Sequence, residues 1–243
     1  MTLTQTDGRL AKTMVADLRT TTTPAMNARH LAGSANWISP PWIPNASREV
    51  MDGVIHLDPA SCAQANDLSV GALMYFDKQI NGLKTPWSHA LPEQDTLTNI
   101  YLNPPGGWES VQIPQQGKCK KTGVPMLSNI AQSIQVSRVK LWWQRLLSES
   151  AQTYFAQAMF LSFSIESMQT TQIECERSVL SFPTCTFRSR VGYINPETNE
   201  VEAGMTHSSA ITYIPGRVDR TEKFVTVFAQ YGVITVPRVA KVA

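Results

Sequence analysis

The chain has 243 residues, and its 21 basic and 19 acidic residues give a net charge of +2. This length can bury a sizeable core without disulfides or metals. Only 16% of the residues are charged, and no block of like charges is present, which excludes a strongly basic nucleic-acid-binding arm. No apolar stretch approaches about eighteen residues, so neither a membrane span nor a cleaved signal peptide is expected.

Residues 1–36 are polar and show little apolar periodicity. Thr20–Pro24 reads TTTTP, and the spacing of Leu10, Met14 and Leu18 leaves a short helix open over residues 8–18. Arms of this kind stay disordered unless a neighbouring surface holds them. We therefore expect an N-terminal arm over residues 1–36, held by a partner subunit, and a single folded domain over residues 37–243.

Residues 37–44, WISPPWIP, combine two tryptophans with three prolines. Proline disfavours both the interior of a helix and a central strand, so we expect a rigid, extended segment here. Trp37 and Trp42 either pack on the flank of their own domain or contact another chain or a ligand, since aromatic anchors dominate interface energetics.

Short strands are predicted over residues 54–57, 70–76 and 97–102, the last inside a long segment rich in Pro and Gly. That segment, residues 81–123, includes Trp87 and Trp108. Loops of this length inside a compact domain are usually functional or take part in interactions.

The densest apolar region, residues 136–165, decides the predicted fold class. Alternation of apolar and polar residues favours strands over residues 138–144 and 158–168, and residues 148–157 are left open. On a strand, Trp142 and Trp143 would point to opposite faces, one of them towards the core. Helical spacing of Phe155, Met159 and Phe163 keeps a helix as the rival interpretation.

The C-terminal third reads as further strands. They are predicted over residues 172–180, 184–194 and 206–214, with a hairpin connection at residues 195–200, NPETNE. Residues 223–236 are apolar on both faces, which indicates a central strand, with a bulge at Gly232.

The sequence contains no convincing catalytic motif. Ser137–Lys140 fits S-x-x-K and Lys121–Gly123 fits K-T-G, but their order is the reverse of that in serine β-lactamases and S-D-N is missing. No glycine-rich nucleotide motif is found. The histidines His30, His56, His89 and His207 are isolated, so no metal site or other cofactor is predicted.

Cysteine spacing predicts free thiols that act as small hydrophobic residues. Cys62, Cys119, Cys175 and Cys185 form no C-x-x-C pair. A bridge between Cys175 and Cys185 across neighbouring strands is left open.

A carbohydrate site is the alternative function. Glu174 and Glu176 would share one face of a strand, about 7 Å apart, which suits the two carboxyls of a glycosidase. Trp87 or Trp108 would stack on a sugar ring. A solvated strand face explains the same two carboxylates.

Together, the N-terminal arm, the short strands, the long loops and the low charge resemble the jelly-roll coat proteins of picorna-like icosahedral viruses. The fold class expected is all-β, an antiparallel β-sandwich. The resemblance implies a structural rather than enzymatic subunit of a protein shell, located in the virion and, during assembly, in the host cytoplasm. Its partners would be copies of itself or related coat subunits, with at most weak contact to packaged nucleic acid. Interface anchors would be Trp37, Trp42, Trp87 and Trp108.

Overall fold

The computed structural model describes residues 37–90, 96–118, 125–202 and 208–237. The chain divides into two units, Met1–Ser34 and Ala35–Ala243. The expected arm, residues 1–36, lies outside the described residues.

A mixed seven-stranded sheet forms the centre of this unit, in the order β11-β7-β10-β6-β3-β1-β2. Neighbours from β2 to β6 pair in parallel, and the pairs β6–β10, β10–β7 and β7–β11 are antiparallel. The expected all-β antiparallel sandwich is therefore wrong. The seven strands are β1 (Leu57–Asp58), β2 (Met74–Tyr75), β3 (Thr98–Leu102), β6 (Phe155–Ser162), β7 (Thr184–Phe187), β10 (Ala210–Pro215) and β11 (Gly232–Thr235).

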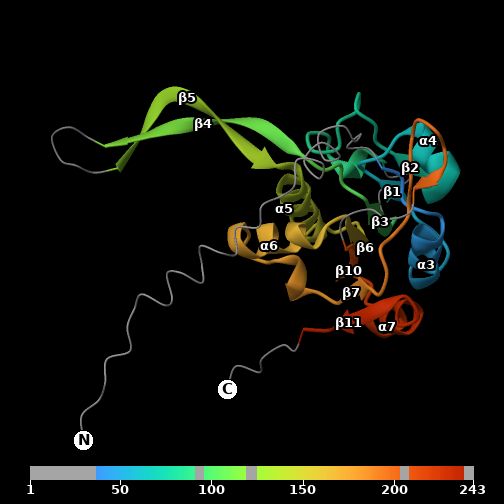
Figure 1. The fold of residues 1–243 in the computed structure, drawn as a ribbon. Helices are drawn as coiled ribbons and strands as arrows, with labels where there is room; N and C mark the ends of the chain where they lie inside the picture. The colour runs from blue at the N-terminus through green and yellow to red at the C-terminus, as the bar shows by residue number, and fades with distance from the viewer. Residues whose placement is uncertain (1–36, 91–95, 119–124, 203–207, 238–243) are drawn as a thin grey trace, which may run out of the picture. The chain divides into compact units, whose positions relative to one another are not determined.

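Helices cover both faces of the sheet (Figure 1). Apolar residues of α3 (Trp42–Val50) and α7 (Thr221–Phe228) pack on one face, and those of α5 (Arg138–Ser150) and α6 (Ile165–Glu174) pack on the other. Short turns of helix occur at α4 (Ala63–Ala65), Asn66–Val70, Trp87–Ala90 and Val179–Ser181. The fold has three layers, helices, sheet and helices, with one core on each side of the sheet.

Burial on both faces explains the largely apolar composition of the central strand β6. In β6, Met159 and Leu161 face the α3 side, whereas Ala158 and Phe160 face the α5 side. Every residue of β3 and β6 is buried. Such strands are typical of sheets covered by helices, and the same pattern also fits the sandwich that the sequence suggested.

The region that decided the predicted fold class is half helix. The strand expected over residues 138–144 is wrong, because α5 occupies it. Trp142, Leu146 and Glu149 are buried at helical spacing, and Trp143 is fully buried beside them; the two rings therefore do not separate as on a strand. Seven alternating residues fit both periods. The strand over residues 158–168 is confirmed only up to Ser162, and α6 begins at Ile165.

Prolines at residues 37–44 do not exclude a helix. Pro41 is the N-cap of α3, and Pro44 lies in its first turn. Amide groups of a first turn have no partner within the helix, so a missing N–H is tolerated there. The extended segment expected here is therefore wrong from Trp42 onwards.

The strands predicted in the C-terminal third are partly wrong and partly confirmed. The strand over residues 172–180 is wrong, because α6 and a helical turn occupy most of it. The central strand over residues 223–236 is also wrong, because α7 ends at Phe228 and β11 is an edge strand. The hairpin is confirmed as β8 (Tyr193–Ile194) paired with β9 (Val201–Glu202). Strand β10 confirms the described part of residues 206–214.

Strands β4 (Trp108–Lys118) and β5 (Pro125–Ser137) form a separate two-stranded ribbon. With β3 and a helical turn, β4 gives regular structure to much of residues 81–123, which the sequence suggested to be largely irregular.

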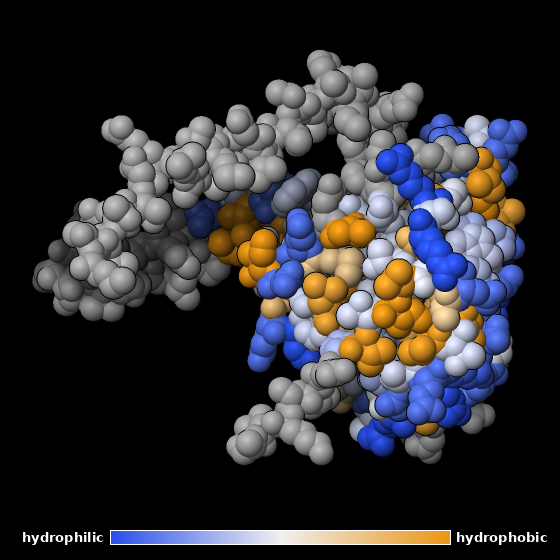
Figure 2. Space-filling model, turned by 60° about the horizontal axis from the view of Figure 1, so that its bottom comes forward, coloured by the Kyte–Doolittle hydropathy of each residue, from blue (hydrophilic) through white to orange (hydrophobic). Residues whose placement is uncertain are grey.

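Figure 2 views another part of the surface, where exposed apolar side chains gather. Exposed examples are Ile173 on α6 and Val233 on β11.

Two cysteines settle the question of a disulfide. Cys62 and Cys185 are free thiols, as predicted, although only Cys185 is buried and Cys62 is exposed. The bridge considered between Cys175 and Cys185 is therefore not formed. Cys185 is buried, and burial raises the pKa of its thiol to about 11. Cys119 lies outside the described residues. No helix in the described ranges has both the length and the apolar character to cross a membrane.

Candidate functional site

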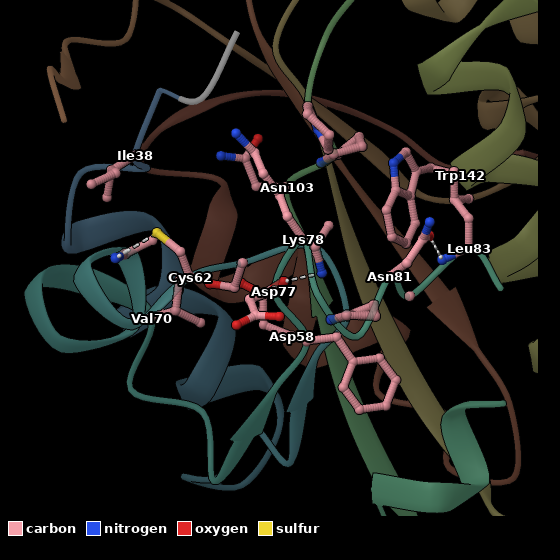
Figure 3. A pocket seen from close by; sticks show the side chains of 18 of the residues that line it. Ile38, Asp58, Cys62, Val70, Asp77, Lys78, Asn81, Leu83, Asn103 and Trp142 are labelled. Carbon is pink, nitrogen blue, oxygen red and sulfur yellow. Dashed lines mark hydrogen bonds between the residues drawn. The ribbon is translucent and has the colours of Figure 1, made fainter. Parts of the chain in front are cut away.

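A cavity of about 610 Å³ opens where three parallel strands end. Asp58 closes β1, Asp77 follows β2, and Asn103 follows β3, and all three line the cavity (Figure 3). Strand β2 pairs with one edge of β1, and the next strand of the sheet, β3, pairs with the opposite edge of β1. In open α/β sheets, ligands bind at such a point, beyond the carboxyl ends of the strands.

Asp58 is the buried carboxyl of the site. It is 2% exposed, and its Oδ1 accepts a hydrogen bond from the backbone N–H of Ala60 at 3.1 Å. Burial raises the pKa of Asp58 to about 7, against the opposing effect of that hydrogen bond. A carboxyl in this state gains from a cation, because a positive charge stabilises the ionised form.

Asp77 begins a tight turn that shapes the cavity wall. Its Oδ1 accepts hydrogen bonds from the backbone N–H groups of Gln79 and Ile80, at 2.8 and 3.0 Å. Asn81 follows with a φ of 53°. A Cβ on the next residue, Gly82, would lie 2.1 Å from the carbonyl oxygen of Pro59. Glycine is therefore required for the turn to lie against the segment after β1.

Asn103 has a fixed orientation. Its Nδ2 donates to the carbonyl oxygen of Trp37 at 3.2 Å and to the hydroxyl of Ser39 at 3.1 Å. Because a carbonyl can only accept, the amide nitrogen must face Trp37, and Oδ1 points the other way. Pro104 and Pro105 come next and have no backbone N–H. This side of the cavity therefore offers hydrogen-bond acceptors and few donors.

Flat apolar groups complete the lining. Trp142 of α5 reaches the cavity beside Leu83 (Figure 3), and Trp37 and Phe76 also line it. At the border with the β4–β5 ribbon, Arg138 and Glu109 form an ion pair at 3.2 Å. Among the described residues, no group of three His, Cys, Asp or Glu side chains could hold a metal ion.

The four tryptophans expected as interface anchors lie in different surroundings. Trp37 lines the cavity, and Trp42 stacks on Tyr231 with ring centroids 4.7 Å apart. Trp87 is fully buried and donates from Nε1 to the carbonyl oxygen of Gly82 at 2.8 Å. Trp108 is 66% exposed. The structure does not bring the four rings together, and their interface role stays a prediction.

Other candidates from the sequence do not meet at this site. Ser137 is the N-cap of α5 and Lys140 lies in its first turn, while residues 121–123 lie outside the described residues. The strand that was to align Glu174 with Glu176 is absent, because α6 ends at Glu174. His56 accepts a hydrogen bond from the backbone N–H of Asn99, and burial lowers its pKa. His89 lies in a helical turn.

Sequence reasoning missed Asp58, Asp77 and Asn103 as site residues. A signal was present in the polar residue that ends or follows a short apolar run, as in LDP at the end of β1 and NPP after β3. Such residues are also typical of ordinary turns, and only parallel pairing brings these positions to one edge. No family model, curated protein or solved structure matches the chain.

Proposed function

We propose that this protein is an S-adenosylmethionine-dependent methyltransferase that acts on the exocyclic amino group of a nucleobase. The observation that carries the proposal is the pairing of an acidic cofactor side, Asp58 and Asp77, with an acceptor-rich substrate side at Asn103. Both sides line one cavity at the point where the strand order reverses.

The acidic side favours a nucleoside cofactor without phosphates. In nucleotide-binding α/β folds, an acidic residue beyond the second strand hydrogen-bonds the ribose, and Asp77 holds that position. The segment after β1 reads DPAS and lacks the glycines that cradle a phosphate. Lys78 also lines the cavity, and Arg138 there is paired with Glu109. Beside these groups, the two carboxyls favour a cation over a pyrophosphate. S-adenosylmethionine combines a nucleoside with a sulfonium and an ammonium group.

The acceptor-rich side favours an amino group as the substrate. Oδ1 of Asn103 and the carbonyl oxygens of a segment that contains two prolines can accept both N–H bonds of an exocyclic amine. Hydrogen bonds of this kind fix the plane of the amine and leave its lone pair directed at the cofactor side. Trp37 and Trp142 offer flat surfaces for an aromatic ring.

Positioning is the main task that the chain performs in such a reaction. When bound, S-adenosylmethionine would supply a methyl group on a positively charged sulfur, which would leave as a neutral thioether, and the methylated nitrogen would release one proton to solvent. Asn103 and its neighbours hold the attacking nitrogen, and Asp58 and Asp77 hold the cationic partner, so reactive distance and alignment come from binding. Since a base inside a duplex cannot reach a cavity of this kind, it would enter flipped out of the stack.

Calorimetry with S-adenosylmethionine, S-adenosylhomocysteine and ATP tests the cofactor side. We expect both sulfur compounds to bind and ATP to fail, because its phosphates meet two carboxyls. Radiolabelled methyl transfer to denatured genomic DNA tests the substrate side.

The Asn103→Ala variant should keep cofactor affinity and lose at least about a hundredfold in transfer rate, the effect expected when a directing acceptor is removed. The exposed Gln144 on α5, changed to Ala, is the control, because it also removes a carboxamide but does not line the cavity. ATP binding in place of the sulfur compounds would overturn the proposal.

The shell-subunit function stays a prediction, and the mixed sheet removes the jelly-roll layout on which it rested. The mass of the native particle by light scattering separates the two functions, because a shell has many copies of the chain.

A further inference from the structure

The β4–β5 ribbon begins at the cavity and leaves the central sheet. Among the described strands, β4 and β5 pair only with each other (Figure 1). Glu109 at the start of β4 and Arg138, directly after β5, line the cavity and join their strands by an ion pair. Eleven residues of β4 at about 3.4 Å each give a ribbon about 35 Å long. An isolated ribbon of this kind needs a further surface for stability.

The two faces of the ribbon differ in character near the cavity. Ser110 lies opposite Gln135, and Gln112 lies opposite Ser133, so all four side chains share one face and are exposed. Val111 pairs with Ile134 on the other face, where side chains are half-buried. One face of the described part is therefore an exposed set of hydroxyl and carboxamide groups.

This neutral polar face suits base edges better than phosphates. A carboxamide has both a donor and an acceptor, so Gln can bond the N6 and N7 atoms of adenine together, and Ser can bond either kind of edge. The major groove of B-DNA, about 12 Å wide, admits a two-stranded β-ribbon. Trp108 lies on the same face as Gln112, beside the cavity, and is 66% exposed.

We propose that the β4–β5 ribbon lies in the major groove of duplex DNA and that Gln112 and Gln135 select the sequence that is methylated. This inference rests on the proposed function, because it supplies the duplex from which the target base is flipped. The position of the ribbon in the groove determines which base lies over the cavity. Phosphate contacts carry no sequence information directly, so base contacts have to supply selectivity.

Selection of bound duplexes from a random 30-base-pair library, in the presence of S-adenosylhomocysteine, tests the inference. Wild type should enrich a defined motif, and the double variant Gln112→Ala/Gln135→Ala should lose preference about tenfold or more at specific positions of it. The matched control, Gln144→Ala, removes an exposed glutamine from α5 and should keep the wild-type motif. Substitution of exposed side chains of this kind has little effect on folding.

A duplex RNA of the enriched sequence should compete poorly, because the deep, narrow major groove of A-form RNA excludes the ribbon. An unchanged motif in the double variant, or equal competition by the RNA, would overturn the inference. Loss of the motif with unchanged S-adenosylhomocysteine binding supports it. Failure of wild type to bind that cofactor product would instead count against the proposed function, and wild type that binds it but enriches no motif would count against the ribbon alone.

Discussion

The Asp58→Asn substitution should stabilise the fold at neutral pH and weaken cofactor binding. Asp58 is 2% exposed, and burial raises the pKa of its carboxyl from 3.8 to about 7. Asparagine has nearly the same shape, and its Oδ1 can keep the hydrogen bond from Ala60. The change removes the buried charge, and the Nδ2 donor of the asparagine replaces an oxygen that can accept from the side chain of Ser61.

The magnitude follows from the two pKa values. One pKa unit corresponds to about 1.4 kcal/mol, so the shift from 3.8 to about 7 corresponds to about 4 kcal/mol. Because the folded state holds the proton more tightly, its stability is fully present below about pH 4 and falls as the pH rises to about 7. A carboxamide in place of this carboxyl does not titrate, so the variant should lack this decline. At pH 8 its free energy of unfolding should exceed that of wild type by up to about 4 kcal/mol.

Urea denaturation of both proteins between pH 4 and pH 8 measures the difference directly, since other titrating groups cancel between them. Asp67→Asn, which removes an exposed carboxyl, is the control and should leave the pH dependence unchanged. Calorimetry at pH 8 should show at least about tenfold weaker binding of S-adenosylmethionine to Asp58→Asn, the loss of one charged contact. Parallel stability curves for wild type and variant would refute the reasoning.

Two further predictions concern packing. Gly82→Ala places a Cβ 2.1 Å from the carbonyl oxygen of Pro59; the clash should cost about 1–3 kcal/mol and weaken cofactor binding, and an unchanged melting temperature would contradict it. Trp143→Ala removes a fully buried ring and its 2.7 Å hydrogen bond to the carbonyl oxygen of Arg177, so urea denaturation should show a loss of about 3–5 kcal/mol. Trp108→Ala, on an exposed ring, should change stability by about 0.5 kcal/mol or less, and equal losses in the two tryptophan variants would show that burial is not the cause.

Several elements were open to prediction because their signals are local. The hairpin at residues 195–200 carries its own turn residues, and β10 ends at Pro215 for a reason that the residue itself provides. β3 was found because Ile100, Tyr101 and Leu102 form a short apolar run bounded by turn residues. Signals of this kind do not depend on what packs against the element.

Other elements could not be assigned from local pattern. Residues 138–144 alternate as a strand would, yet α5 forms because Trp142, Trp143 and Leu146 find a sheet face to pack against. Residues 223–228 read as a strand that is apolar on both faces. They form most of α7, which buries Phe224 and Phe228 in the core. Periodicity in a short segment fits two structures, and tertiary burial decides between them.

The low charge, the capacity for a sizeable core and the local turns follow from the residues alone. The fold class and the site depend on how distant parts of the chain pack together. Asp58, Asp77 and Asn103 are far apart in the chain and meet because parallel pairing of β2, β1 and β3 brings their carboxyl ends to one edge. Strand direction is set by the crossover connections and by packing on both faces of the sheet. It therefore cannot be predicted from the residues of a single strand.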